Sequence, residues 1–189
     1  MNIVYENIDN PIEIITPGYS NDQISITVEG ANIFTQSPHK YILRPIKGQR
    51  KCTLKLSAKE DGKLRLIGAE YFRIRSLPTP IPQLGGLPNN GLPQAKAAVV
   101  AQTTLISTYG PGFGYNLQNR VTGYKAKVIT ADSVYTFKND APVLKLDMRE
   151  VIKATQPGDV ILFYEIQSET TLKKDTLKVN CPSIVIPIR

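Results

Sequence analysis

Residues 109–115 carry the most distinctive chemical pattern of the chain, because they read YGPGFGY and combine three aromatic rings with three glycines. Glycine loops that cradle phosphate run directly into a helix whose first amides meet the anion. No helix pattern follows here. The segment is therefore either an irregular loop between strands or an exposed aromatic contact surface for a protein partner, formed by Tyr109, Phe113 and Tyr115.

Candidate catalytic residues are few. The one histidine, His39, lies in a turn-like stretch, and Ser-His-Asp catalysis would need it as the base. No sequence feature nominates a nucleophile or an orienting carboxylate, so a hydrolase stays only as the enzymatic alternative. One histidine and two cysteines cannot build a multi-histidine metal centre or a dense disulfide framework. We expect no enzyme activity, no cofactor, no metal site and no small-molecule substrate.

The two cysteines, Cys52 and Cys181, alternate with apolar residues in strand-like runs. This pattern predicts small buried side chains in both places. The two lie in different halves of the chain, and a disulfide requires close approach of those halves. Their pairing is left open by the sequence.

Charge is spread along the chain. Lys and Arg number 23 and Asp and Glu number 16, a net charge of +7, without a long basic run. Nucleic-acid sites concentrate charge on one face, so we expect solvated lysines and no nucleic-acid partner. Residues 1–15 lack a signal-peptide pattern, and the longest apolar runs fall far short of the ~20 residues that cross a bilayer.

Short runs rich in Val, Ile, Thr and Tyr, bounded by turn residues, predict strands through most of the chain. In the first part we expect them over residues 2–5, 12–16, 24–29, 41–44, 52–58, 63–68 and 71–75. About seven short strands in such a length is typical of an immunoglobulin-like sandwich. Asp61-Gly62 predicts a tight hairpin turn.

Residues 77–93 are rich in proline and glycine and predict a semi-rigid interdomain linker, to which we assign Pro78, Pro80, Pro82 and Leu84. Residues 1–76 then form the first domain and residues 94–189 the second. In the second we expect strands over residues 95–108, 123–130, 133–137, 160–168, 177–181 and 184–188. A helix is expected over residues 148–154, with Asp147 and Glu150 as a capping box. The predicted fold class is all-β, with two consecutive β-sandwich domains, the second β-rich with one short helix.

The order of three segments carries a family resemblance. Residues 10–14 read NPIEI, residues 71–80 read YFRIRSLPTP, and residues 157–166 read PGDVILFYEI. In this order the chain resembles, over nearly its whole length, the C-terminal periplasmic region of the GldM (PorM) family. That family serves the gliding-motility and type IX secretion motor of Bacteroidetes. The first sandwich resembles its penultimate domain and the second its last.

This resemblance implies a homodimeric rod in the periplasm that couples an inner-membrane motor to outer-membrane-associated ring proteins. It implies a non-catalytic structural and protein-interaction module that docks and transmits force. The alternative is a free-standing carbohydrate- or surface-binding β-sandwich protein, in which tyrosine would replace the absent tryptophan as the stacking ring.

Overall fold

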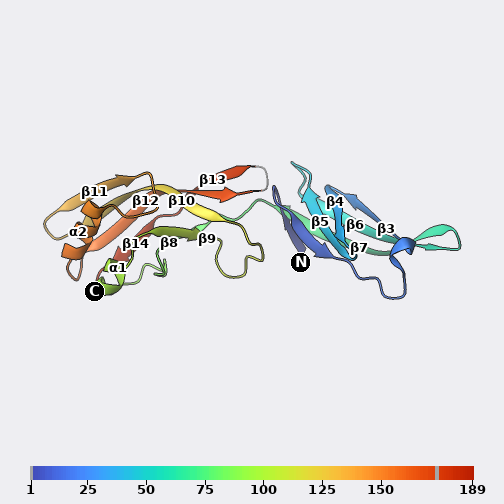
Figure 1. Ribbon diagram of the computed structural model, residues 1–189, viewed down its shortest axis with the longest axis horizontal. Coiled ribbons are helices and arrows are strands. Elements are labelled where there is room, and N and C mark those ends of the chain that lie inside the picture. The colour runs from blue at the N-terminus through green and yellow to red at the C-terminus, as the bar shows by residue number, and fades with distance from the viewer. Residues whose placement is uncertain (1, 173–174) are drawn as a thin grey trace. The chain divides into compact units, whose positions relative to one another are not determined.

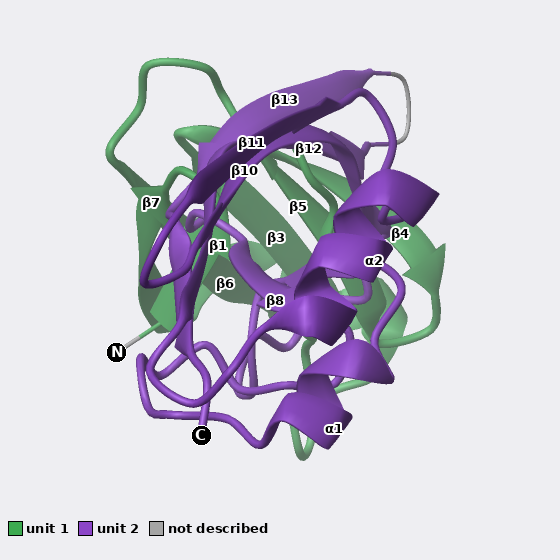
Figure 2. Ribbon diagram, turned by 90° about the vertical axis from the view of Figure 1, so that its left-hand side faces the viewer, with its two compact units in different colours: residues 1–77 green, residues 78–189 purple. Residues whose placement is uncertain are grey.

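A computed structural model describes residues 2–172 and 175–189 of the chain. The chain divides into two compact units, Met1–Leu77 and Pro78–Arg189, coloured separately in Figure 2. Strands dominate both units, which confirms the all-β sandwich class predicted from the sequence.

The first unit is an immunoglobulin-like sandwich of two sheets (Figure 1). One sheet has the order β1 (Asn2–Tyr5), β7 (Lys63–Arg75), β6 (Lys51–Glu60) and β3 (Ile24–Glu29), and the other β2 (Asn10–Glu13), β5 (Lys40–Pro45) and β4 (Ala31–Ser37). A 3-10 turn, Asn21–Gln23, precedes β3. β1 runs parallel to β7, and the other pairs are antiparallel. Apolar side chains of both sheets meet in one core, made of Val4, Ala31, Leu43, Cys52, Leu54 and Ile74.

The hairpin between β6 and β7 turns at Asp61 and Gly62, where φ is 49° and 78°. Positive φ at both turn residues is the geometry that an Asp-Gly pair favours, so the predicted turn is confirmed. The two strands expected over residues 63–68 and 71–75 are one continuous strand, β7. β4 was not predicted, because only Ala31 of its seven residues is buried and its apolar alternation is weak.

The second unit is built on a five-stranded sheet. β10 (Asn119–Ile129) and β12 (Val160–Thr171) form its centre, and β11 (Val134–Asn139) flanks β10. β13 (Thr176–Cys181) and β14 (Ile184–Pro187) pair with successive halves of the other side of β12. A separate two-stranded sheet joins β8 (Ile81–Leu84) to β9 (Leu105–Thr108).

One face of the five-stranded sheet is covered within the second unit. α1 (Lys96–Val100) and α2 (Leu146–Ala154) lie on the same side of the sheet as β8 (Figure 2). The resulting core joins residues of β8, β9 and the two helices to the inner face of the sheet: Leu84, Val99, Leu105, Met148 and Ile152 with Val128, Ile161 and Phe163. We call the opposite side of the sheet its outer face.

β10 and β12 each contain a bulge, and the two bulges compensate one another. Thr122 is an extra residue in β10, between the pairs Val121–Ser168 and Gly123–Gln167. β12 then gains an extra residue near Glu165, whose φ is 49°. The register before and after the two bulges is therefore the same, and both strands keep buried side chains on the inner face throughout.

Residues 95–108, predicted as one strand, are instead α1 followed by β9. Residues 95–101 read AKAAVVA, and alanine is the strongest helix former. A short apolar run cannot be assigned to helix or strand by periodicity alone. The prediction was wrong because it extended the β pattern of the rest of the chain into this segment.

A strand, β8, lies in the segment predicted as a linker. Ile81–Leu84 pairs with β9. Pro82 is tolerated there because β8 pairs with a strand on one side only. The backbone N–H that proline lacks is therefore not needed to pair with a second strand.

The helix expected over residues 148–154 is α2, but the predicted capping box is wrong. The N-cap is Lys145, and Asp147 lies inside the first turn, where its Oδ1 accepts a 2.8 Å hydrogen bond from the Met148 N–H. An acidic side chain at that place still favours the helix through its dipole.

Gly30 offers a test of the first sandwich. Its φ is 81°, and a Cβ there would collide with the backbone oxygen of Lys51. Gly18 has a φ of 88° with open space around it. We expect Gly18→Ala to lower the free energy of unfolding by about 1 kcal/mol through its φ alone, and Gly30→Ala by at least about 3 kcal/mol. Denaturant unfolding measures both, and equal losses would contradict the close approach at Gly30.

Candidate functional site

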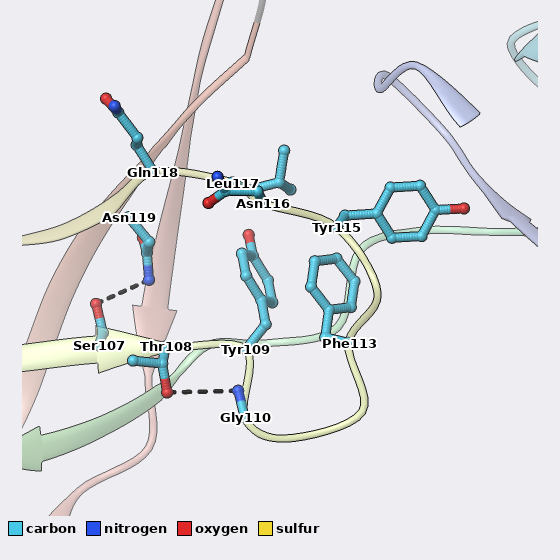
Figure 3. A pocket seen from close by; sticks show the side chains of 10 residues that line it. All are labelled: Ser107, Thr108, Tyr109, Gly110, Phe113, Tyr115, Asn116, Leu117, Gln118 and Asn119. Atoms are coloured by element: carbon cyan, nitrogen blue, oxygen red, sulfur yellow. Dashed lines mark hydrogen bonds between the residues drawn. The ribbon is translucent and has the colours of Figure 1, made fainter. Parts of the chain in front are cut away.

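The candidate site is the loop of residues 109–118, which connects β9 to β10 in the second unit, and buried polar side chains hold its base. Asn119 Nδ2 donates a 2.8 Å hydrogen bond to Ser107 Oγ (Figure 3). Asn119 Oδ1 accepts a 3.1 Å bond from Thr170 Oγ1. Because that bond uses the one proton of the Thr170 hydroxyl, the Tyr109 hydroxyl at 2.6 Å is the donor to Thr170. Three strands thus meet at the start of the loop.

The aromatic side chains of the loop form a ladder. The ring centroids of Tyr109 and Phe113 lie 4.5 Å apart at an interplanar angle of 28°. Phe113 and Tyr115 follow at 5.3 Å and 45°. These separations are typical of favourable aromatic pairs. The structure therefore brings together the three residues that the sequence singles out, and each ring is half-buried.

An open pocket of about 440 Å³ lies within this loop. That volume falls in the range of about 300–1,000 Å³ typical of ligand sites. Its lining offers aromatic rings, hydroxyls and amides without Asp, Glu, Lys, Arg or His: Ser107, Thr108, Tyr109, Gly110, Phe113, Tyr115, Asn116, Leu117, Gln118 and Asn119 (Figure 3). Such a surface suits uncharged contacts with a partner.

Burial raises the pKa of the Tyr109 hydroxyl. Burial likewise raises the pKa of the Cys181 thiol, whose Sγ lies 3.2 Å from Ser168 Oγ. The pKa of Cys52 is raised by the same cause. Both cysteines are buried free thiols, as the burial prediction required, and a raised pKa makes them poor nucleophiles.

His39 occupies the turn between β4 and β5 with a φ of 63°. Its Nδ1 lies 3.2 Å from the backbone oxygen of Ile14, in the first unit. Within residues 2–172 and 175–189, no group of three or more His, Cys, Asp or Glu side chains is placed to hold a metal ion.

The four residues assigned to the linker by sequence fall within the second unit. Pro78 is exposed, whereas Pro80 and Pro82 are buried. Leu84 is fully buried and packs in the core of that unit.

Sequence reasoning missed the polar network of Ser107, Asn119 and Thr170. Two of them could have been found from the strand periodicity. Ser107 lies two residues after buried Leu105, and Thr170 lies four residues after buried Ile166, so both fall on the buried side of their strands. Polar residues in a buried phase require hydrogen-bond partners.

The comparison with known families decides the nature of the first unit. Residues 1–75 match the family model of the GldM third domain. Residues 1–75 are therefore similar to a domain of the C-terminal region of GldM. No curated protein matches the chain. The second unit lies outside the matched residues, so its likeness to the last GldM domain stays a prediction.

The match over residues 1–75 supports a structural module related to the gliding and type IX secretion motor. GldM domains of this kind are periplasmic parts of a membrane-anchored protein, and the family is a structural motor component. Among the described residues, no helix has the length and apolar character needed to cross a membrane.

The Tyr109 hydroxyl gives a second test. Tyr109→Phe removes its hydrogen bond to buried Thr170, so we expect the second unit to lose about 1–2 kcal/mol of stability. The pKa of Tyr109 is higher in the folded chain than in the unfolded chain, so the unfolded chain gives up the Tyr109 proton at a lower pH. The stability that the protonated Tyr109 contributes is therefore complete below pH ~10 and is lost as the pH rises above that value. Tyr109→Phe lacks this group, so the variant should lose less stability over the same pH range. Chemical unfolding at pH 7 and above pH 10 measures both effects. Tyr135→Phe, a change at an exposed tyrosine, is the control at pH 7. An equal loss of stability in the two variants would contradict the hydrogen bond between Tyr109 and Thr170.

Proposed function

We propose that this chain is a non-catalytic segment of a periplasmic shaft that belongs to a gliding and type IX secretion motor. It forms a homodimer, docks to outer-membrane-associated ring proteins and transmits force between them and the motor. The observation that carries the proposal is the GldM third-domain match over residues 1–75, followed directly by a second folded sandwich.

Force transmission requires that little slack separates the folded units. β7 of the first unit ends at Arg75 and β8 of the second begins at Ile81, so a short segment of the chain joins the two strands. The junction reads Pro78-Thr79-Pro80, and each proline fixes its own φ and restricts the preceding residue. These features support a stiff junction.

Docking is proposed at the aromatic loop of residues 109–118. Aromatic side chains are enriched at the centres of protein interfaces, where they add large contact areas at a low entropic cost. The hydrogen bonds among Ser107, Asn119 and Thr170 hold the base of the loop in place. Binding therefore costs less conformational entropy than it would for an unrestrained loop.

A second candidate function is binding of a neutral carbohydrate. The favouring observation is the uncharged lining of the pocket, which includes two tyrosine rings and the amides of Asn116 and Gln118. A glycan array that gives specific binding, lost in Tyr115→Ala, would promote this candidate over protein docking.

The docking proposal predicts a dimer by size-exclusion chromatography with light scattering, and a complex with the outer-membrane-associated ring proteins in pull-down. Phe113→Ser should weaken the complex at least about tenfold, which corresponds to the loss of one aromatic anchor. The control is Leu92→Ser, a change at an exposed apolar side chain outside the loop. A monomer at all concentrations, or unchanged ring binding by Phe113→Ser, contradicts the proposal.

The stiff junction predicts a change in solution scattering. Pro78→Gly frees φ at the junction, so we expect a wider spread of interunit orientations and a changed small-angle X-ray scattering profile. Pro88→Gly changes another exposed proline and should leave the profile as it is. Identical profiles for the parent chain and Pro78→Gly would show that the proline does not set the geometry.

A further inference from the structure

The outer face of the five-stranded sheet carries apolar side chains in register across four strands. One row contains Pro187 of β14, Val160 of β12, Ile129 of β10 and Val134 of β11. Two residues further along each strand, the next row contains Val185, Leu162, Lys127 and Thr136. Side chains two residues apart lie on the same face, so the two rows form one surface.

At this end the sheet therefore carries apolar side chains on both faces. On the inner face, Ile161 and Val128 are fully buried by the core. On the outer face, Val134 is 59% exposed, Val185 44% and Ile129 37%. An antiparallel sheet with one wet face normally alternates apolar and polar residues, whereas β12 begins VILFY, as a strand covered on both sides does.

Positive charge borders these rows. The third row on the same face contains Tyr164, Lys125 and Lys138. The Nζ atom of Lys127 lies 5.9 Å from the centre of the Tyr164 ring. Lys125 forms a 2.7 Å ion pair with Glu165, while among the described residues Lys127 and Lys138 have no ion pair. The face thus has a surplus of positive charge beside its apolar surface.

The size of the face limits what can cover it. Four strands span about 15 Å between their axes, and three rows span about 14 Å. A single helix about 10–12 Å wide fits a surface of these dimensions. A second copy docked through the same face would instead bring the positive charge of Lys127 and Lys138 against the same charge on its partner, which disfavours a symmetric pair.

We propose that the outer face binds an acidic amphipathic segment of a partner protein. Its apolar side chains lie on Ile129, Val134 and Val160, and its carboxylates meet Lys127 and Lys138. The inference rests on the proposed function only in taking the chain as an interaction module, and the surface is separate from the aromatic loop.

The test selects short peptides from a displayed random library on the immobilised full chain, and then measures the affinity of the selected peptides in solution. We expect the peptides to combine apolar residues with Asp or Glu, and their affinity to fall as salt rises. Lys127→Glu should weaken binding at least about tenfold. Val134→Ser and Val185→Ser should each weaken it several-fold, and since both side chains are exposed, folding is kept.

Two variants in the first unit serve as matched controls. Lys47→Glu reverses an exposed charge, and Leu64→Ser removes a side chain that is 66% exposed. Neither should change peptide affinity. Failure to enrich any peptide, enrichment of peptides without acidic residues, or equal weakening by the controls overturns the proposal. Conversion of a dimer to a monomer by Val134→Ser also overturns it, because the face would then join two copies. Ring proteins are absent from this experiment, so its result is independent of the docking test on Phe113.

Discussion

The pairing of β10 with β12 is the interaction on which the second unit depends. These are the long central strands of its sheet, and their compensating bulges keep the inner face buried along both of them. At one end of the pair, Asn119 and Thr170 bond and hold the aromatic loop. At the other end, Ile129 faces Val160 on the outer face. One strand pair thus positions both surfaces that are proposed to bind partners.

The two units support the functional account in different ways. The first unit is tied to the GldM third domain by a family match, and its sandwich is held by a conventional apolar core around Leu43 and Leu54. The second unit lies beyond that match, so its role has to be argued from physical features. Those features are an uncharged aromatic pocket and a sheet with apolar side chains on both faces. Both are proposed as surfaces for binding.

Features governed by local chemistry could be predicted from the sequence. The alternation of apolar and polar residues predicted the strand Ile24–Glu29, and the Asp-Gly pair predicted the hairpin turn. The three aromatic residues singled out in the YGPGFGY segment are those whose rings stack in the structure. Features governed by distant contacts could not. β8 is a strand because β9 lies beside it, and the bulges of β10 and β12 are compensating only as a pair. The Asn119–Thr170 bond joins residues 51 positions apart, which a single sequence does not reveal.

We propose that the chain is a passive interaction module whose binding surfaces lie in the second unit. Hydrogen exchange measured by mass spectrometry, on the full chain alone and with the outer-membrane-associated ring proteins added, locates those surfaces. We expect slower exchange in residues 109–119 with the ring proteins, and unchanged exchange in the sandwich core around Leu43. Unchanged exchange throughout the second unit, or protection confined to the first unit, would contradict it.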